Sequence, residues 1–257
     1  MYHYGLKLWS INNNYLQEAV RLYSAGVYDY IELFVVPGSY NDFSTLWSHL
    51  PMPFIIHAPH FDMGMNLADR TARDRNLYLA HETIRFADTL HAETIIFHPG
   101  VSGDINETVR QLNDIHDERI VIENKPYYGH NDILCNGCSP VEIKHITENA
   151  KVGFCLDIGH AICYANAIKL DPMACLSKFI ELKPKMYHLT DGSYNAMYDC
   201  HKHICKGDYN FFEILPLLPD DCTMTIETEK DSSITLDDFT EDISSLKNII
   251  AKLKSEK

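Results

Sequence analysis

The sequence has 257 residues, of which 46% are hydrophobic and 23% charged, and its formal net charge is −14 at pH 7. This length and composition predict one globular domain over residues 1–257 with a full hydrophobic core. No run of about eighteen apolar residues is present, which argues against a membrane-spanning segment. The acidic charge weighs mildly against a protein that binds a nucleic-acid backbone. The first ten residues lack the pattern of a signal peptide, so a cytoplasmic protein is expected.

Short runs rich in Ile, Val, Leu, Phe and Tyr alternate with amphipathic segments along the chain. Continuous apolar runs of this kind are typical of parallel strands that are buried on both faces. Strands are predicted at residues 3–9, 28–36, 53–59, 93–100, 119–124, 152–160, 185–191 and 223–229. Helices are predicted at residues 14–26, 73–92, 171–183 and 235–257. The alternation predicts a single (β/α)8 TIM barrel, with a doubly wound sheet as the alternative.

Acidic and histidine side chains follow six of the predicted strands at the point where each strand ends. In a barrel these ends meet at one rim, so we expect the side chains to converge. The residues are His57, His98, Glu123, Asp157, His160, His188, Asp199, His201 and Glu227.

Such crowding of carboxylates and imidazoles is unfavourable without a compensating positive charge. Mixed nitrogen and oxygen donors suit Zn²⁺ or Mn²⁺, and also Fe²⁺, better than Ca²⁺ or Mg²⁺. The sequence therefore predicts a site for divalent metal. Glu123 and Glu227 are the candidate catalytic residues, because a carboxylate can bridge two cations or act as a base.

Four further residues are candidate substrate contacts at the mouth of the predicted barrel. They are Lys7, His60, Lys125 and His203, with a solvated loop as the alternative reading for Lys125. Cys135 and Cys138 form a C-x-x-C pair, but a zinc ribbon would need a second pair, which the sequence lacks. Loop thiols around an Asn-Gly turn are expected, with a local disulfide or a redox role as the alternative.

Seven segments resemble, in order, the motifs of the xylose-isomerase-like TIM-barrel superfamily, which includes endonuclease IV (AP endonuclease family 2). They are IHAPHFDMGMNLAD, FHPG, IEN, LDIGHA, HLTD, DCHKHICKGDYNF and IETE, spanning about Phe54 to Glu227. On the endonuclease IV side, the resemblance implies three zinc ions and hydrolysis of a phosphodiester. The implied ligand groups are His57, His98 and Glu123; Glu123, Asp157, His188 and Glu227; and His160, Asp199 and His201.

On the isomerase and epimerase side, the resemblance implies one metal ion held by Glu123, Asp157, His188 and Glu227. The two glutamates would then exchange a proton with a carbon atom of a sugar. Departures from endonuclease IV, among them KGD at residues 206–208 where a GEG turn is expected, favour this branch, whereas the set of nine ligands favours the other. The loop LFVVPGSYND has no Lys or Arg, His60 stands where an aromatic residue is expected, and Cys200 stands where a basic residue is expected.

The sequence therefore predicts a metal-dependent isomerase or epimerase that acts on a small sugar or sugar phosphate. It does not determine the oligomeric state; a homodimer is what the resemblance to this kind of barrel implies. A trinuclear-zinc phosphodiesterase acting on DNA or a smaller phosphoester is the alternative. A non-enzymatic metal-binding protein is the third reading.

Overall fold

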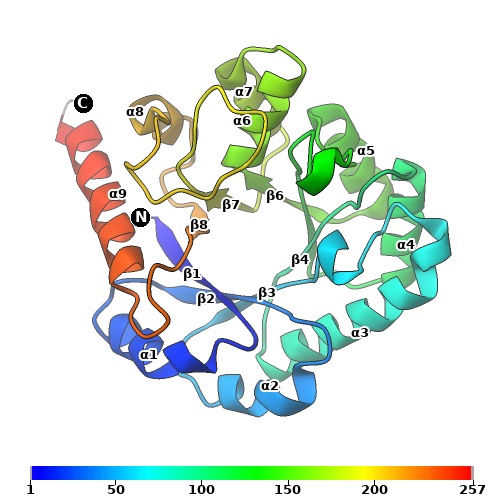
Figure 1. Cartoon of the computed structure of the whole chain (residues 1–257), viewed down its shortest axis with the longest axis horizontal. Coiled ribbons are helices and arrows are strands. Elements are labelled where there is room, and N and C mark those ends of the chain that lie inside the picture. Colours follow the sequence, from blue (N-terminus) through cyan, green and yellow to red (C-terminus); the bar gives the residue numbers. More distant parts are fainter. Residues whose placement is uncertain (1, 256–257) are drawn as a thin grey trace.

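Eight parallel strands close into a barrel in the computed structural model, which describes residues 2–255. The strands follow one another around the barrel in chain order, and the first pairs with the last (Figure 1). This closure confirms the predicted (β/α)8 fold class and excludes the doubly wound sheet. The strands are β1 (His3–Trp9), β2 (Tyr30–Phe34), β3 (Phe54–His57), β4 (Ile95–Phe97), β5 (Ile120–Glu123), β6 (Gly153–Asp157), β7 (Met186–Leu189) and β8 (Thr223–Ile226).

Helices surround the barrel and cover its outer face (Figure 1). They are α1 (Leu16–Ser24), α2 (Tyr40–Ser48), α3 (Arg73–Thr89), α4 (Ile105–Ile115), α5 (Pro140–Ala150), α6 (Ile158–Ala167), α7 (Pro172–Ile180), α8 (Phe211–Ile214) and α9 (Asp237–Ser255). The four predicted helices are present with shorter ends. Residues 256–257 of the last predicted helix lie outside the described part of the chain.

The predicted strand 152–160 is wrong at its end, because helix α6 already begins at Ile158. The Asp157 carboxylate accepts a hydrogen bond of 2.6 Å from the backbone N–H of His160. This is a helix N-cap, which satisfies a backbone donor that the first turn leaves free. His160 is thereby held in the first turn of α6, directly beside the end of the strand.

A small apolar cluster fills the barrel interior. Its members are Ile96, Val121, Cys155 and Met186, all buried, with Ile55 packed against them. Residues i and i+2 of a strand face the same side of the sheet. The residues two positions further along these strands are His57, His98, Glu123, Asp157 and His188. The apolar cluster thus forms a floor, and the predicted ligands stand one layer above it.

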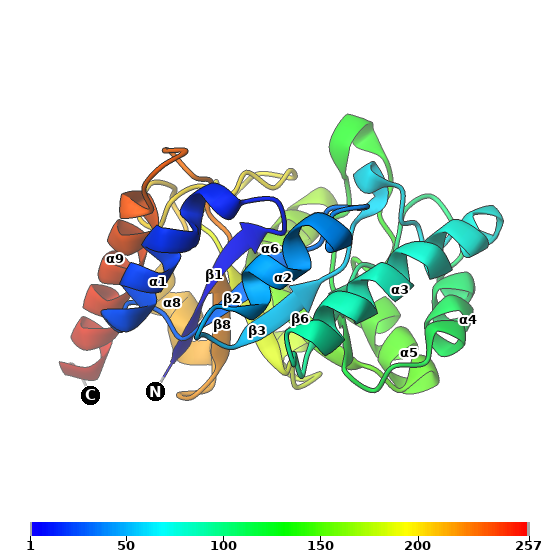
Figure 2. The ribbon, with the colours of Figure 1, turned by 90° about the horizontal axis from the view of Figure 1, so that it is seen from below.

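Figure 2 shows the barrel from the side, with the start of β1 and the end of α9 at the same end of the molecule. The strands point away from that end, so the loops that follow them gather at the other end. Within residues 2–255, no helix is long and apolar enough to cross a membrane.

Candidate metal centre

The nine predicted ligand residues lie together at the carboxyl end of the barrel, and we call them the rim cluster. Six of them are buried, and Asp199, His201 and Glu227 are half-buried. Within the described residues, their ligand atoms form several groups of three in which all atoms lie within 4.8 Å of one another.

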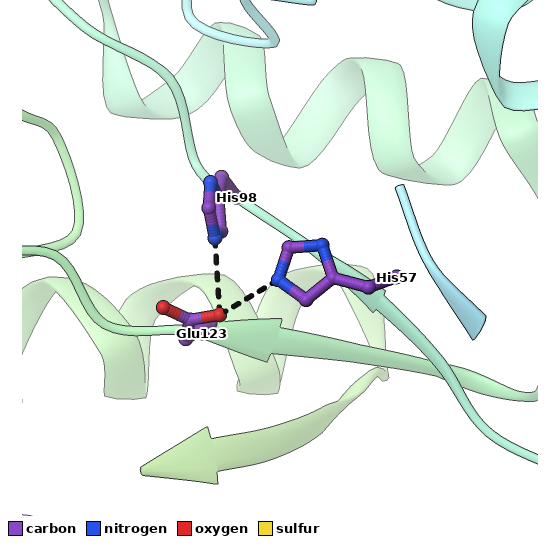
Figure 3. Close-up of side chains that lie close together, drawn as sticks. All are labelled: His57, His98 and Glu123. Atoms are coloured by element: carbon purple, nitrogen blue, oxygen red, sulfur yellow. Dashed lines mark hydrogen bonds and ion pairs between the residues drawn. The ribbon is translucent and has the colours of Figure 1, made fainter. Parts of the chain in front are cut away.

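Glu123 lies at the centre of the first group. Its Oε2 atom is 3.1 Å from His57 Nε2 and 3.0 Å from His98 Nε2. Figure 3 shows the two imidazole rings, from the ends of β3 and β4, pointing at the same carboxylate oxygen. Two nitrogens and one oxygen therefore converge on one point.

Asp199 joins two histidines in the second group. Its Oδ2 atom is 2.7 Å from His201 Nε2 and 3.4 Å from His160 Nε2. His201 has a φ of 37°, in the left-handed region. Its Nδ1 atom donates to the carbonyl oxygen of Glu227 at 2.7 Å.

Asp157, His188 and Glu227 form the third group. His188 Nδ1 is 2.9 Å from Glu227 Oε1 and 3.3 Å from Glu123 Oε2, yet it makes no hydrogen bond within the described residues. A buried polar atom without a partner is costly in a protein interior. This nitrogen points between two carboxylates, which is the arrangement that a shared cation would complete.

Three of the histidines are held by backbone carbonyls. His57 Nδ1 lies 2.8 Å from the carbonyl oxygen of Ala58, and His160 Nδ1 lies 2.8 Å from that of Asn124. His201 Nδ1 makes the same kind of contact with Glu227. A ring nitrogen that donates to a carbonyl leaves the other nitrogen with a free lone pair. The Nε2 atoms of these rings thus face the carboxylates and are the nitrogens that a metal ion would bind.

The charges of the cluster also suit a cation. Burial and the charges of Asp199, Glu123 and Glu227 raise the pKa of Asp157 to about 6, against the opposing effect of His160. Burial and the nearby Lys125 ammonium hold the pKa of His98 well below 6.5, so this ring is neutral. Burial opposes the charged form of His160, but Asp157, Asp199 and Glu123 together raise the pKa of this ring to about 10. A divalent cation would replace such ring protons and balance the carboxylates, so the donor set fits Zn²⁺, Mn²⁺ or Fe²⁺.

Glu32 of β2 lies below the rim cluster and was not predicted from the sequence. It is fully buried, and its Oε2 atom is 2.9 Å from His188 Nε2 and 2.6 Å from the Thr225 hydroxyl. Its sequence signal is a single carboxylate inside the apolar strand YIELF.

Lys7 of β1 lies between two carboxylates. Its ammonium is 2.5 Å from Glu32 Oε1 and also contacts Glu227 Oε1. Glu32, His57 and Glu227 form another group with metal-ligand spacing. The Lys7 ammonium already pairs with both carboxylates of that group, so it takes the place of a cation there.

A cavity of about 1030 Å³ opens above the rim cluster. Two aromatic pairs line it from different sides of the barrel. Trp9 and Phe34 at the ends of β1 and β2 have ring centroids 5.6 Å apart, and Tyr128 and Tyr198 after β5 and β7 have centroids 5.8 Å apart. Metal-ligand spacing below and aromatic walls above describe a site for a small molecule.

The predicted substrate contacts divide into two sets. Lys7, His60 and Lys125 line the cavity, and the Lys125 ammonium is 3.8 Å from Glu123 Oε1. His203 lies apart from it, since its Nδ1 donates to Asp242 of α9 at 2.9 Å. The structure therefore does not bring His203 to the site. The sequence spacing could not reveal this, because the partner of His203 lies 39 residues away.

Asp191 fastens the segment that carries Asp199 and His201. Its side chain accepts hydrogen bonds from the backbone N–H groups of Gly192 at 2.7 Å, Gly207 at 3.0 Å and Tyr209 at 3.1 Å. Its backbone pairs with Lys202 in both directions at 2.9 Å. One buried carboxylate thus ties both ends of this segment together.

Cys135 and Cys138 are both buried, free thiols. The Cys138 thiol lies 3.4 Å from the Glu142 carboxylate in the first turn of α5. This contact raises the pKa of Cys138 further than burial alone does. The pair therefore lies in a packed turn that leads into α5.

Comparison with known proteins gives one family. The family model described as xylose isomerase-like TIM barrel matches residues 21–249. An uncharacterized protein of Methanocaldococcus jannaschii is 24% identical over 173 residues, which are 62% of this chain and 63% of that protein. The probable endonuclease 4 of Aquifex aeolicus is 25% identical over 208 residues, which are 71% of this chain and 72% of that protein. The chain thus spans less than two thirds of the first of these relatives.

Solved structures show the same fold at low sequence identity. A D-tagatose 3-epimerase-like protein has a TM-score of 0.70 at 19% identity, with 98% of each chain covered. Endonuclease IV from Thermus thermophilus has a TM-score of 0.72 at 18% identity, with 97% of this chain and 99% of that chain covered. At such identities the likeness concerns the fold and does not separate an epimerase from an endonuclease.

Proposed function

Because this chain belongs to the xylose isomerase-like TIM barrel family, we propose that it is a divalent-metal-dependent isomerase or epimerase of a small sugar or sugar phosphate. One observation carries the proposal. The rim cluster lies at the bottom of a cavity of about 1030 Å³, which is the upper end of the size range of small-molecule sites. The aromatic walls of this cavity suit the apolar face of a sugar ring.

The charge around the cavity supports a small substrate over a DNA strand. The segment after β2, residues 35–39, carries no Lys or Arg, and the whole chain has a net charge of −14. A DNA-binding enzyme needs basic side chains along the phosphate backbone. Lys125 at the cavity wall offers one ammonium group, which is enough for a single phosphate or carbonyl oxygen.

Glu123, Asp157, His188 and Glu227 are the residues that would hold the ion. A bound Zn²⁺ or Mn²⁺, or Fe²⁺, would polarise a substrate carbonyl and stabilise the negative charge that develops on its oxygen. Glu123 and Glu227 would exchange a proton with the neighbouring carbon. One carboxylate takes the proton from the C–H bond, and the other returns a proton to the opposite face.

Proton exchange with solvent tests this proposal. The metal-loaded protein is incubated in D₂O with a panel of ketoses, aldoses and their phosphates, and deuterium on the carbon beside the carbonyl is followed by NMR. We expect incorporation with at least one substrate and a loss of about 10²- to 10⁴-fold in Glu227→Gln, the usual contribution of a general base. Metal-loaded protein that exchanges no proton in any member of the panel would contradict the proposal.

A phosphodiesterase is the second candidate, and the group His160, Asp199 and His201 favours it. An enzyme with one ion on the four residues named above does not need this group. The discriminating experiment counts bound metal ions and measures cleavage of a duplex that contains an abasic site. Three ions per chain with cleavage would establish the second candidate, whereas one ion without cleavage at high enzyme concentration would exclude it. Replacing Asp199 and His201 together should abolish hydrolysis but reduce isomerisation much less.

Two further expectations from the sequence stay predictions. Light scattering of the purified chain tests the homodimer, and localisation of the tagged full-length protein tests the cytoplasmic location.

A further inference from the structure

We propose that Glu32 is a positioning residue that fixes the His188 ring with Nδ1 directed at the bound metal. The inference rests on the proposed metal site but not on the identity of the substrate. It concerns contacts of the chain's own residues around Glu32, which is itself fully buried.

The contacts of Glu32 determine which nitrogen of His188 carries the proton. Glu32 accepts from the Lys7 ammonium at Oε1 and from the Thr225 hydroxyl at Oε2. A carboxylate that already pairs with an ammonium acts as an acceptor. His188 Nε2, at 2.9 Å from Oε2, is therefore the donor, which leaves Nδ1 as the nitrogen that a metal ion would bind.

His188 directs a different ring nitrogen at the carboxylates than three other histidines of the rim cluster do. His57, His160 and His201 anchor Nδ1 on a backbone carbonyl and present Nε2 to the carboxylates. His188 presents Nδ1 instead, 2.9 Å from Glu227 Oε1. Its anchored nitrogen has a side-chain partner, so its orientation depends on one replaceable residue.

Glu32 also acts on a second ligand of the same group. It holds the Lys7 ammonium, and Lys7 in turn contacts Glu227. Removing the Glu32 carboxylate would therefore release both His188 and Lys7 at once. The group Asp157, His188 and Glu227 should be affected, whereas His160, Asp199 and His201 make no hydrogen bond or ion pair with Glu32 and should not.

Metal binding by Glu32→Gln and Glu32→Met tests the proposal, with Zn²⁺ as the probe in calorimetric titrations of the full chain. We expect one bound ion to be weakened by about 10- to 100-fold, the usual effect of removing the partner of a ligand histidine. Glu32→Met should lose at least as much as Glu32→Gln, which keeps one acceptor oxygen. The matched control is Glu82→Gln. Glu82 is also a buried carboxylate, but it accepts from the backbone of Gly38 and Tyr40 at 2.9 and 3.0 Å, away from the cluster.

A second readout follows the ring itself. Nitrogen-15 NMR of histidine-labelled, Zn²⁺-loaded protein should show His188 protonated at Nε2 and metal-bound at Nδ1. If Glu32→Met does not fold, the proposal is tested by this spectrum and by Zn²⁺ binding to Glu32→Gln. Wild-type Zn²⁺ affinity at every site in Glu32→Gln, or a His188 ring protonated at Nδ1, would overturn the inference. A wild-type chain that binds Zn²⁺ but exchanges no sugar proton would instead overturn the proposed function alone.

Discussion

Replacing Asp242 of α9 by alanine should destabilise the fold without touching the rim cluster. Asp242 is 2% exposed. Its carboxylate accepts from the backbone N–H of Ile204 at 2.7 Å, from the Thr228 hydroxyl at 2.7 Å and from His203 Nδ1 at 2.9 Å. It therefore fastens the segment after β7 and the segment after β8 to the last helix.

The magnitude follows from what the substitution leaves behind. Alanine leaves three donors of a buried network without their acceptor, and hydrogen bonds to a charged group contribute about 1.5–3 kcal/mol each. These contributions do not add fully, because the three donors share one carboxylate. Breaking a buried pair by removing one partner costs about 3–5 kcal/mol, and we expect this loss in the free energy of unfolding. For a chain of this size, that corresponds to a fall of about 6–20 °C in Tm.

Urea and thermal unfolding of metal-free protein provide the assay, so that metal binding does not contribute to the measured stability. The control is Glu241→Ala, which removes an exposed carboxylate from the preceding residue of the same helix. An exposed site of this kind should change stability by no more than about 0.5 kcal/mol. If Asp242→Ala unfolds at the same urea concentration as Glu241→Ala, the three contacts do not stabilise the protein and the reasoning fails.

Three further outcomes are expected. Chelation of Zn²⁺-loaded protein should lower its Tm, because an ion present at about 100 times its Kd contributes about 2.7 kcal/mol, and an unchanged scanning-calorimetry trace would contradict a bound metal. Lys7→Met should lower the Tm of the metal-free protein but enlarge the gain in Tm on adding Zn²⁺, since Glu32 and Glu227 lose the ammonium that they share; equal gains in both proteins would refute this. Side-chain hydrogen bonds from Arg119 lower the pKa of Asp117 from its ordinary 3.8, so the pair stabilises the fold above that pH and its contribution is lost as the pH falls through the lowered value. The difference in urea stability between wild type and Asp117→Asn should therefore be full at about pH 7 and shrink below about pH 4, and a constant difference would argue against the pairing.

The ends of the strands carried most of the information that the sequence held about the site. His98 and Glu123 each stand two residues beyond an apolar side chain of the barrel interior, so strand periodicity and closure alone place them on one layer. No contact between distant residues had to be known for this prediction. The fold class followed from the same pattern.

What the sequence could not provide depends on distant partners. Glu32 lies inside a strand rather than at its end, and its partner His188 is 156 residues away. His203 lies in the same polar segment as His201, two residues further along the chain, but it pairs with Asp242 of α9 instead of facing the cavity. The start of α6 was missed for another reason. Asp157 ends an apolar run that predicts a strand, and its side chain at the same time caps the helix that follows.

The three amide contacts of Asp191 have a consequence for how this protein can change over evolutionary time. The backbone pairing of Asp191 with Lys202 holds the position of Asp199 and His201 from one end, and the contacts to Gly207 and Tyr209 close the other. Residues 193–198 lie between these fixed points and include Tyr198 of the cavity wall. Asn166 donates to the backbone carbonyls of Tyr194 and Ala196, so side chains of this stretch can be exchanged while its backbone and the residues beneath it stay in place. Substitutions in this loop are therefore the ones expected to change substrate preference without altering the barrel.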